Sequence, residues 1–297
     1  MTTFQEKDII QVCLERLSGI YGSSVHLTNS VSVGGGCINN AVKLCTSAGD
    51  FFLKWNALAP PDMFEKEAAG LLEMRLANSS LVIPEVIFCS YNDDFPSLIM
   101  MEFLQSPKST QGFDELLGRG LAQLHRKSAN KFGFHHSNYC GTTVQENSWT
   151  ERWVDFYGQY RITRLIEDLK VKRRLSVDDE KIYEKLIDRL PILLPHKTVP
   201  SLIHGDLWSG NYICSANGPA LIDPACYYAD REMELGMMKL FGGFSSRVWA
   251  AYQEEWPLPE EWEDRNLLYQ LYHVLNHYLL FGGSYGWQAL KIAKSYL

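Results

Sequence analysis

Apolar residues recur at helical spacing at the start of the chain, and the pattern then changes to that of β-strands. The helical repeat predicts a first helix that ends near Gly19 and buries Ile9, Ile10, Cys13, Leu14 and Leu17. Thr3 and Glu6 have the spacing of a capping box at its start. Apolar-rich runs separated by glycine-containing turns follow at 25–33, 41–46 and 51–55. We expect these runs to form three antiparallel strands.

A second helix and two further strands complete this first region. Asp62 is placed to cap a helix that runs to about Ala77, and β-type runs follow near 86–89 and 98–103. Residues 105–109 have the composition of a linker. Beyond it, helical periodicity occurs at 112–127, 149–169, 178–194, 230–241, 246–255, 261–281 and 284–296, with a β-rich island at 200–223. The pattern predicts an α+β, two-lobed chain, with a small antiparallel β lobe at 1–104 and a larger, mainly helical lobe at 105–297.

Charge and composition narrow the possible partners. The formal net charge of −7 disfavours a protein that covers nucleic-acid phosphates. No apolar run approaches the roughly 20 residues that a membrane helix needs. The start lacks the basic and apolar regions of a signal peptide, and the 7 cysteines, without a CxxC pair, fit reduced thiols. We expect a cytoplasmic monomer that binds neither nucleic acid nor membrane.

The segment from His204 to Asn211, followed by Asp223, carries the strongest chemical signal. Asp206 is a candidate base for a hydroxyl proton, and His204 has the spacing of a residue that orients the loop without reacting. Asn211 and Asp223 offer the hard oxygen atoms that Mg²⁺ prefers beside nucleotide phosphates. The alternative is that Asp206 and Asn211 are turn residues between strands. The combination favours phosphoryl transfer.

A nucleotide site for that chemistry is predicted in the β lobe. Glycines between two strands would let the backbone approach phosphates, and a plain hairpin turn is the alternative; the residues concerned are Gly34, Gly35, Gly36 and the adjacent Cys37. Lys54 follows in an apolar strand and could reach phosphates if a carboxylate anchors it. Glu67 is the expected anchor, because it lies toward the packed face of its helix, and Glu65 is the second choice. Otherwise Lys54 would be an edge-strand lysine in solvent.

Three further features carry weaker expectations. Backbone groups of Glu102, Phe103 and Leu104, at the crossover between the lobes, could pair with an adenine edge. Oxidation of Cys37 could block nucleotide binding, although a small side chain that fills a gap explains it equally well. His273 and His277 are four apart on a helix, but no HExxH glutamate or nearby third ligand is readable. Buried histidines with satisfied hydrogen bonds are therefore favoured over a metal site.

Taken together, these residues make the chain resemble the protein-kinase-like phosphotransferases, and within them the fructosamine/ketosamine kinase family. The motifs that carry this resemblance lie at 141–150, 204–211, 223–225, 234–244 and 275–283. The resemblance implies a protein-kinase-like fold, with ATP and Mg²⁺ as cofactors. It also implies phosphorylation of the 3-hydroxyl of a ketosamine, on glycated small molecules or on glycated lysines of proteins, which promotes deglycation. It further implies a sugar pocket near Asn147, Trp149, Glu151 and Trp208.

Two positions depart from related patterns. Pro224 stands where protein kinases carry the Phe of DFG, and no APE-like segment is visible, which argues against a protein kinase gated by loop phosphorylation. Glu234 stands where the family pattern leads us to expect aspartate, so its contact is left open.

Two other functions compete with this interpretation. One is an aminoglycoside or choline-type kinase, which would share Asp206, Asn211 and Asp223. The other is a pseudokinase that acts as a binding module, which would have lost Lys54, Asp206 or Asp223. The sequence does not rank ribulosamine, erythrulosamine and fructosamine as acceptors.

Overall fold

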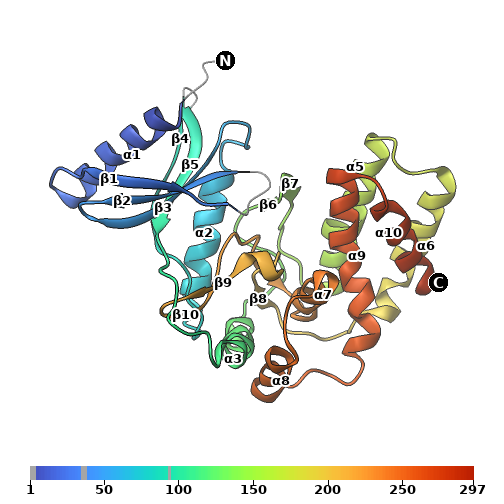
Figure 1. The fold of residues 1–297 in the computed structure, drawn as a ribbon. Coiled ribbons are helices and arrows are strands. Elements are labelled where there is room, and N and C mark those ends of the chain that lie inside the picture. The colour runs from blue at the N-terminus through green and yellow to red at the C-terminus, as the bar shows by residue number, and fades with distance from the viewer. Residues whose placement is uncertain (1–4, 35–38, 93–94) are drawn as a thin grey trace.

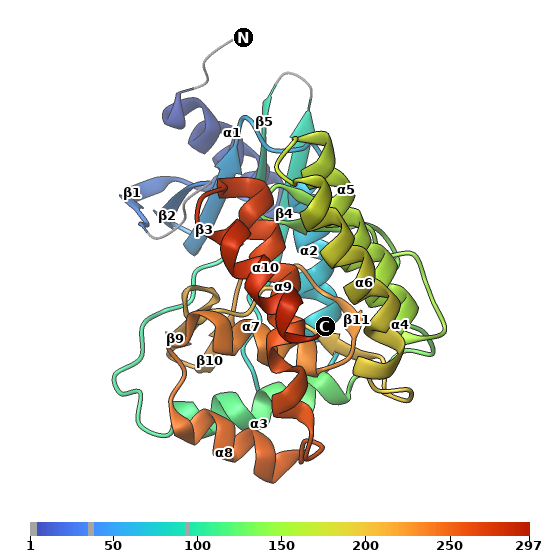
Figure 2. The same cartoon turned by 90° about the vertical axis from the view of Figure 1, so that its right-hand side faces the viewer.

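The computed structural model describes residues 5–34, 39–92 and 95–297 as a β-rich lobe joined to a larger helical lobe (Figures 1 and 2). The β lobe consists of α1 (Glu6–Tyr21), β1 (Leu27–Ser32), β2 (Asn40–Thr46), β3 (Gly49–Asn56), α2 (Met63–Arg75), β4 (Val86–Asn92) and β5 (Phe95–Glu102). Its strands form an antiparallel sheet in the order β1-β2-β3-β5-β4. The predicted strands are all present.

Alternation along the strands gives the sheet two apolar faces, each covered by a helix. Leu98 and Met100 of β5 pack in one cluster with Ile9 and Leu17 of α1. Their neighbours Ile99 and Met101 pack in the other cluster, with the inner face of α2 and the helical lobe. The helix α2 therefore lies between the sheet and the larger lobe, where Figure 1 shows it.

The start and end of α1 differ from the prediction. Gln5 is the N-cap and forms a capping box with Asp8, whereas Thr3 lies outside the described residues. The helix also continues past Gly19 to Tyr21 and ends at Gly22, whose left-handed backbone (φ 67°) is the usual geometry of a C-terminal cap. A glycine inside a helix lowers its stability without ending it.

The larger lobe is mainly helical, as predicted. Its helices are α3 (Phe113–Arg126), α4 (Trp153–Phe156), a π-helical segment at Tyr157–Thr163, α5 (Arg164–Val171), α6 (Val177–Leu193), a 3₁₀ turn at Ser209–Asn211, α7 (Glu232–Phe241), α8 (Ser246–Glu255), α9 (Trp262–Phe281) and α10 (Tyr285–Ser295). Its strands pair as β6 (Asn138–Cys140) with β7 (Thr143–Gln145), β8 (Ser201–Ile203) with β11 (Tyr227–Ala229), and β9 (Tyr212–Ser215) with β10 (Gly218–Leu221).

Two predicted boundaries in this lobe are wrong. The helix expected from 149 begins at Trp153, because residues up to Thr150 are paired in extended backbone: Thr150 and Phe132 exchange two backbone hydrogen bonds. The helix expected from 230 begins at Glu232, because β11 comes first. The β6–β7 hairpin is absent from the prediction altogether. Within the described part of the chain, no helix is both long and apolar enough to cross a membrane.

Candidate functional site

The lysine of β3 connects the β lobe to the loop that carries Asp223. Lys54 shares a sheet face with Ile99, its cross-strand partner, and so points toward α2. Its Nζ donates to Glu67 Oε1 at 2.7 Å and to Asp223 Oδ1 at 2.9 Å, and the residue is 4% exposed. The structure pairs Lys54 with Glu67, as predicted, whereas Glu65 is exposed. The edge-strand lysine in solvent is ruled out.

Lys54, Glu67 and Asp223 are close enough for their opposite charges to offset the cost of burying them. Burial by itself would lower the pKa of Lys54, but the carboxylates of Asp223 and Glu67 outweigh it and raise that pKa. Burial raises the pKa of Glu67 to about 7, and the Lys54 ammonium opposes that rise. A buried ion pair of this kind is costly to break, since removal of one partner leaves the other charge without compensation.

The helix α2 touches the Asp223 loop directly. A Cβ at Gly70 would lie 3.1 Å from Cys226 Sγ and 3.4 Å from Pro224 Cγ. Gly70 is one turn beyond Glu67, so both face the same loop. Glycine at this position thus allows the close approach that places Glu67 within reach of the lysine that also holds Asp223.

His204 and Asn211 hold the loop around Asp206. The His204 ring donates from Nε2 to the Ile222 carbonyl at 2.8 Å, and its Nδ1 accepts the Asp206 backbone N–H at 3.2 Å. Burial lowers the pKa of His204, so the ring is neutral and this pair of bonds fixes its tautomer. Asn211 Nδ2 donates to the Asp206 carbonyl at 2.9 Å. His204 therefore has the contacts of an orienting residue, and the Asn211 amide oxygen is left for another ligand.

Glu234 of α7 supports the same loop from behind. Its buried carboxylate accepts the backbone N–H groups of His204 and, at 3.2 Å, Gly205. Gly205 has φ 85°, and a Cβ there would lie 2.2 Å from the Ala225 carbonyl oxygen. The contact of Glu234 that the sequence left open is thus made with the backbone of the loop that carries Asp206. The signal for it was an acidic residue inside an apolar helical run, because a buried charge requires partners.

Burial and the negative charges near Asp206 favour its protonated form. Burial, followed by the charges of Glu234 and Asp223, raises the pKa of Asp206 to about 8. Asp223 itself has a left-handed backbone (φ 55°), which is uncommon for a residue other than glycine and typical of functional sites. Its side chain is 41% exposed, so the carboxylate that contacts Lys54 also faces open space.

The residues predicted for the phosphate and adenine contacts are only partly described. Gly35, Gly36 and Cys37 lie outside the described residues, and a Cβ at Gly34 would meet open space. At the crossover, the Glu102 N–H donates to the Glu85 carbonyl and the Phe103 N–H to the Asp50 carbonyl. The Leu104 N–H makes no backbone hydrogen bond within the described ranges.

The residues predicted for the sugar pocket are dispersed. Asn147 is buried, and its amide is engaged with Asn138 and Arg161. The ring of Trp149 contacts His135 and Tyr228, and Glu151 pairs with Lys131 at 2.7 Å on the surface. None of these contacts reaches the Asp206 loop.

Trp208 belongs to that loop. Its N–H donates to the Asp206 carbonyl, its carbonyl accepts the Asn211 N–H, and the residue is 37% exposed. Of the four predicted residues, Trp208 is the one that the described backbone places beside Asp206.

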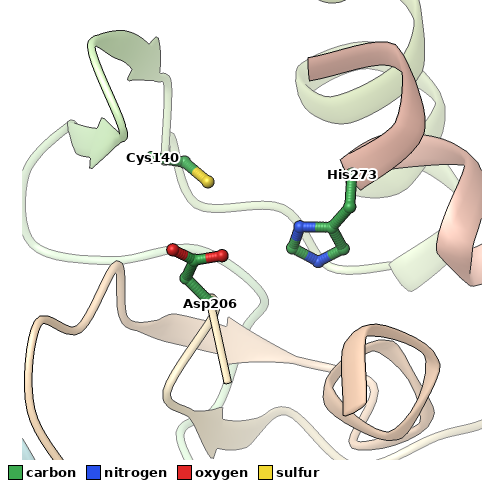
Figure 3. A group of neighbouring side chains, drawn as sticks. All are labelled: Cys140, Asp206 and His273. Carbon is green, nitrogen blue, oxygen red and sulfur yellow. The ribbon is translucent and has the colours of Figure 1, made fainter. Parts of the chain in front are cut away.

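Two residues beside Asp206 were not predicted to be near it. Cys140 of β6 and His273 of α9 converge on its carboxylate (Figure 3), and the ligand atoms of the three lie within 4.8 Å of one another. His273 is buried, as expected, but its Nδ1 has no hydrogen-bond partner within the described structure. Two expectations are therefore wrong for His273: its hydrogen bonds are not all satisfied within the described residues, and further possible metal ligands, Cys140 and Asp206, do lie nearby. At His277, Nδ1 contacts the His273 carbonyl oxygen.

Comparison with known proteins agrees with this arrangement. A sequence model of the family described as fructosamine kinase matches residues 9–297. A chloroplastic protein-ribulosamine 3-kinase of Oryza sativa subsp. indica is 40% identical over 283 residues, which cover 93% of this chain and 81% of that protein. A crystal structure from Thermobifida fusca, assigned as a fructosamine-3-kinase, has a TM-score of 0.83 at 30% identity, covering 95% of this chain and 97% of that one.

A more distant likeness concerns the fold alone. An aminoglycoside phosphotransferase, crystallised in a ternary complex with ADP and hygromycin B, matches with a TM-score of 0.64 at 15% identity over 95% of this chain and 98% of that one. These likenesses and the arrangement of the elements confirm the predicted α+β, protein-kinase-like fold.

Proposed function

The chain belongs to the fructosamine kinase family and is a kinase, and we propose that it transfers the γ-phosphoryl group of ATP to the 3-hydroxyl of a ketosamine. The observation that carries this proposal is the bridge from Lys54 Nζ to both Glu67 and Asp223, which joins the β lobe to the loop next to Asp206. A site for phosphates needs such a cation beside a metal-binding carboxylate. The retained Lys54, Asp206 and Asp223 argue against a pseudokinase.

Asp206 is the proposed base. The 3-hydroxyl oxygen of the acceptor forms a bond to the γ-phosphorus while the bond to the oxygen that bridges the β- and γ-phosphates breaks. The hydroxyl proton passes to the Asp206 carboxylate, and ADP leaves. His204, Asn211 and Glu234 hold Asp206 in position through the loop backbone and take no part in the bond changes.

Asn211 and Asp223 are the proposed magnesium ligands. Both offer hard oxygen atoms, and the partly exposed Asp223 carboxylate faces open space, so the donor set fits the ion. Bound Mg²⁺ would neutralise charge on the phosphates. Its charge would also lower the pKa of Asp206 from the value of about 8 that holds without metal, and so favour the ionised base.

The acceptor is proposed from the names of relatives and from the surroundings of Asp206. The Oryza sativa relative is named for ribulosamines on proteins. Trp208, in the loop beside Asp206, offers an aromatic face to a sugar. Asn147, Trp149 and Glu151 stay proposals for the same pocket, with Asn147 supporting it from the interior. The natural acceptors would be glycated small molecules or glycated lysines, and a cytoplasmic monomer stays a prediction.

An acceptor panel with the purified protein tests the proposal. ADP release is measured with Mg-ATP and with lysine carrying ribulosamine, erythrulosamine or fructosamine, with choline and an aminoglycoside as comparison acceptors. We expect turnover with at least one ketosamine. Asp206→Asn should lower kcat by about 10²–10⁴-fold, the usual contribution of a general base, while nucleotide still raises the thermal stability. Turnover that survives Asp206→Asn would overturn the mechanism, and turnover with only the comparison acceptors would overturn the substrate.

A further inference from the structure

The group formed by Cys140, Asp206 and His273 combines one sulfur, one oxygen and one nitrogen donor. In the described part of the chain it is the one group of three such residues whose ligand atoms all lie within 4.8 Å of one another. The three come from β6, the catalytic loop and α9, and Figure 3 shows them converging on a common space. We propose that these residues form a binding site for Zn²⁺, and that the bound ion inhibits the kinase by occupying Asp206.

The donor set distinguishes this site from the one proposed for magnesium. Zinc binds thiolate, imidazole and carboxylate together, whereas Mg²⁺ is confined to hard oxygen ligands. With bonds of about 2.3 Å to sulfur and about 2.0–2.2 Å to nitrogen and oxygen, the ligand atoms of tetrahedral zinc lie about 3.5 Å apart. The three side chains therefore need to approach by only about 1 Å, which side-chain rotation supplies.

The state of each side chain suits ligation. Nδ1 of His273 is buried without a hydrogen-bond partner in the described structure, so a metal would satisfy an atom that is otherwise costly to bury. Burial lowers the pKa of His273 to about 3, which leaves the imidazole neutral and its lone pair free. Cys140 is protonated without metal, because burial raises its pKa. Formation of the zinc–sulfur bond therefore releases the thiol proton to solvent.

Neighbouring groups hold the ligands in place. Asn276, one turn beyond His273 along α9, donates from Nδ2 to Cys140 Sγ at 3.3 Å and to the Cys140 carbonyl at 3.2 Å. Thr143 of β7 in turn donates to Asn276 Oδ1 at 2.6 Å. Such contacts behind the ligands are what fixes the geometry of metal sites. Cys140 and His273 are buried and Asp206 is partly exposed, so the ion and a fourth ligand such as water would enter from the Asp206 side.

Binding is tested without turnover. Co²⁺, which substitutes for zinc, is titrated into the nucleotide-free protein, and thiolate-to-cobalt charge-transfer absorption is recorded. We expect the band in the parent and in Cys13→Ala, which removes a thiol buried in the other apolar cluster. The band should be lost in Cys140→Ala. His273→Gln should retain it with affinity at least about 10-fold weaker, the loss seen when even an outer contact of a metal site is removed. A band that persists in Cys140→Ala, or its absence from the parent, overturns the site.

Inhibition is tested separately, and only this part rests on the proposed function. With saturating Mg-ATP, low micromolar Zn²⁺ should inhibit the parent and Cys13→Ala, and excess Mg²⁺ should not restore activity. Cys140→Ala, compared with its own rate without zinc, should require at least about 100-fold more Zn²⁺ than the parent for the same fractional inhibition. If cobalt binds through Cys140 while zinc leaves turnover unchanged, the metal site stands and the role of Asp206 as base fails. Equal inhibition of the parent and Cys140→Ala overturns the inhibitory site.

Discussion

Two buried cations lie near the site, and the protein compensates their charges in different ways. Lys54 of β3 contacts two carboxylates, Glu67 and Asp223. Arg161 of the π-helical segment is fully buried, yet no ion pair within the described residues includes it. It donates to Asn147 Oδ1 at 2.6 Å and to the Glu146 carbonyl at 2.8 Å, and its guanidinium lies over aromatic rings.

The difference suggests two roles: the contacts of Lys54 can be replaced by a ligand, whereas those of Arg161 support the fold. In the proposed function, phosphate oxygens would bind the Lys54 ammonium and Mg²⁺ would bind the Asp223 carboxylate, so the contacts of Lys54 can be exchanged. The contacts of Arg161 are fixed by packing: its guanidinium carbon lies 4.0 Å from the ring centroid of Tyr227 and 4.6 Å from that of Phe156. Arg161 also belongs to the π-helical segment, a distortion often found at functional sites.

Arg161→Met should have the largest effect on stability. It leaves the Asn147 and Glu146 oxygen atoms without a donor and removes the cation–π contacts. Since hydrogen bonds to a charged group contribute about 1.5–3 kcal/mol and a desolvated cation–π contact about 2 kcal/mol, we expect a loss of at least about 3 kcal/mol in the free energy of unfolding. Urea denaturation measures it.

Arg164→Met is the matched control. Arg164 begins α5 directly after the π-helical segment, is 48% exposed and pairs with Asp168 at 3.3 Å. An exposed pair of this kind contributes about 0–1 kcal/mol. Equal losses of unfolding free energy in the two variants would show that the buried hydrogen bonds and aromatic contacts of Arg161 stabilise the protein no more than an exposed ion pair does.

Glu67→Gln should act mainly on the nucleotide, because Asp223 still compensates the charge of Lys54. The amide of Gln can still accept a hydrogen bond from Lys54. That bond is about half as strong as the bond to the charged carboxylate. A loss of about 1.4 kcal/mol would lower kcat/KM for ATP about tenfold. Glu65→Gln, on the same helix but exposed, should leave kcat/KM for ATP within twofold of the parent. A comparable loss in both variants would remove Glu67 from the nucleotide site.

The same contrast explains what could be predicted from the sequence. The Lys54–Glu67 pair joins neighbouring elements, and hydrophobic periodicity places both residues toward one packed interface. The loop around Asp206 carries its own spacing signature, so the orienting contact of His204 could be anticipated, whereas the contact of Asn211 with the Asp206 carbonyl was not predicted. Outside residues 130–150, the helices and strands also followed from periodicity, apart from β11, which lies beyond the predicted β-rich island.

The surroundings of Asp206 formed by β6 and α9 depend on contacts that no local sequence pattern records. Cys140 meets His273 only because a short hairpin, β6–β7, packs against α9. Three-residue strands are too short to show a period of two, so the hairpin was not predicted. Likewise, the place of Arg161 depends on a π-helical turn that helical periodicity cannot distinguish from an α-helix.

A last prediction separates two tryptophans of nearly equal exposure. Trp208 is 37% exposed and lies in the loop of Asp206, whereas Trp149 is 38% exposed and contacts His135 and Tyr228. Trp208→Ala should raise the acceptor KM about tenfold, since covering an aromatic face with a sugar contributes about 1–2 kcal/mol. Trp149→Ala should change that KM less than about threefold, equivalent to about 0.6 kcal/mol. Initial rates at varied ketosamine and saturating Mg-ATP measure both, with the KM for ATP as the internal control. A larger effect from Trp149→Ala would place the sugar pocket on the Trp149 side and leave Trp208 as a structural residue of the loop.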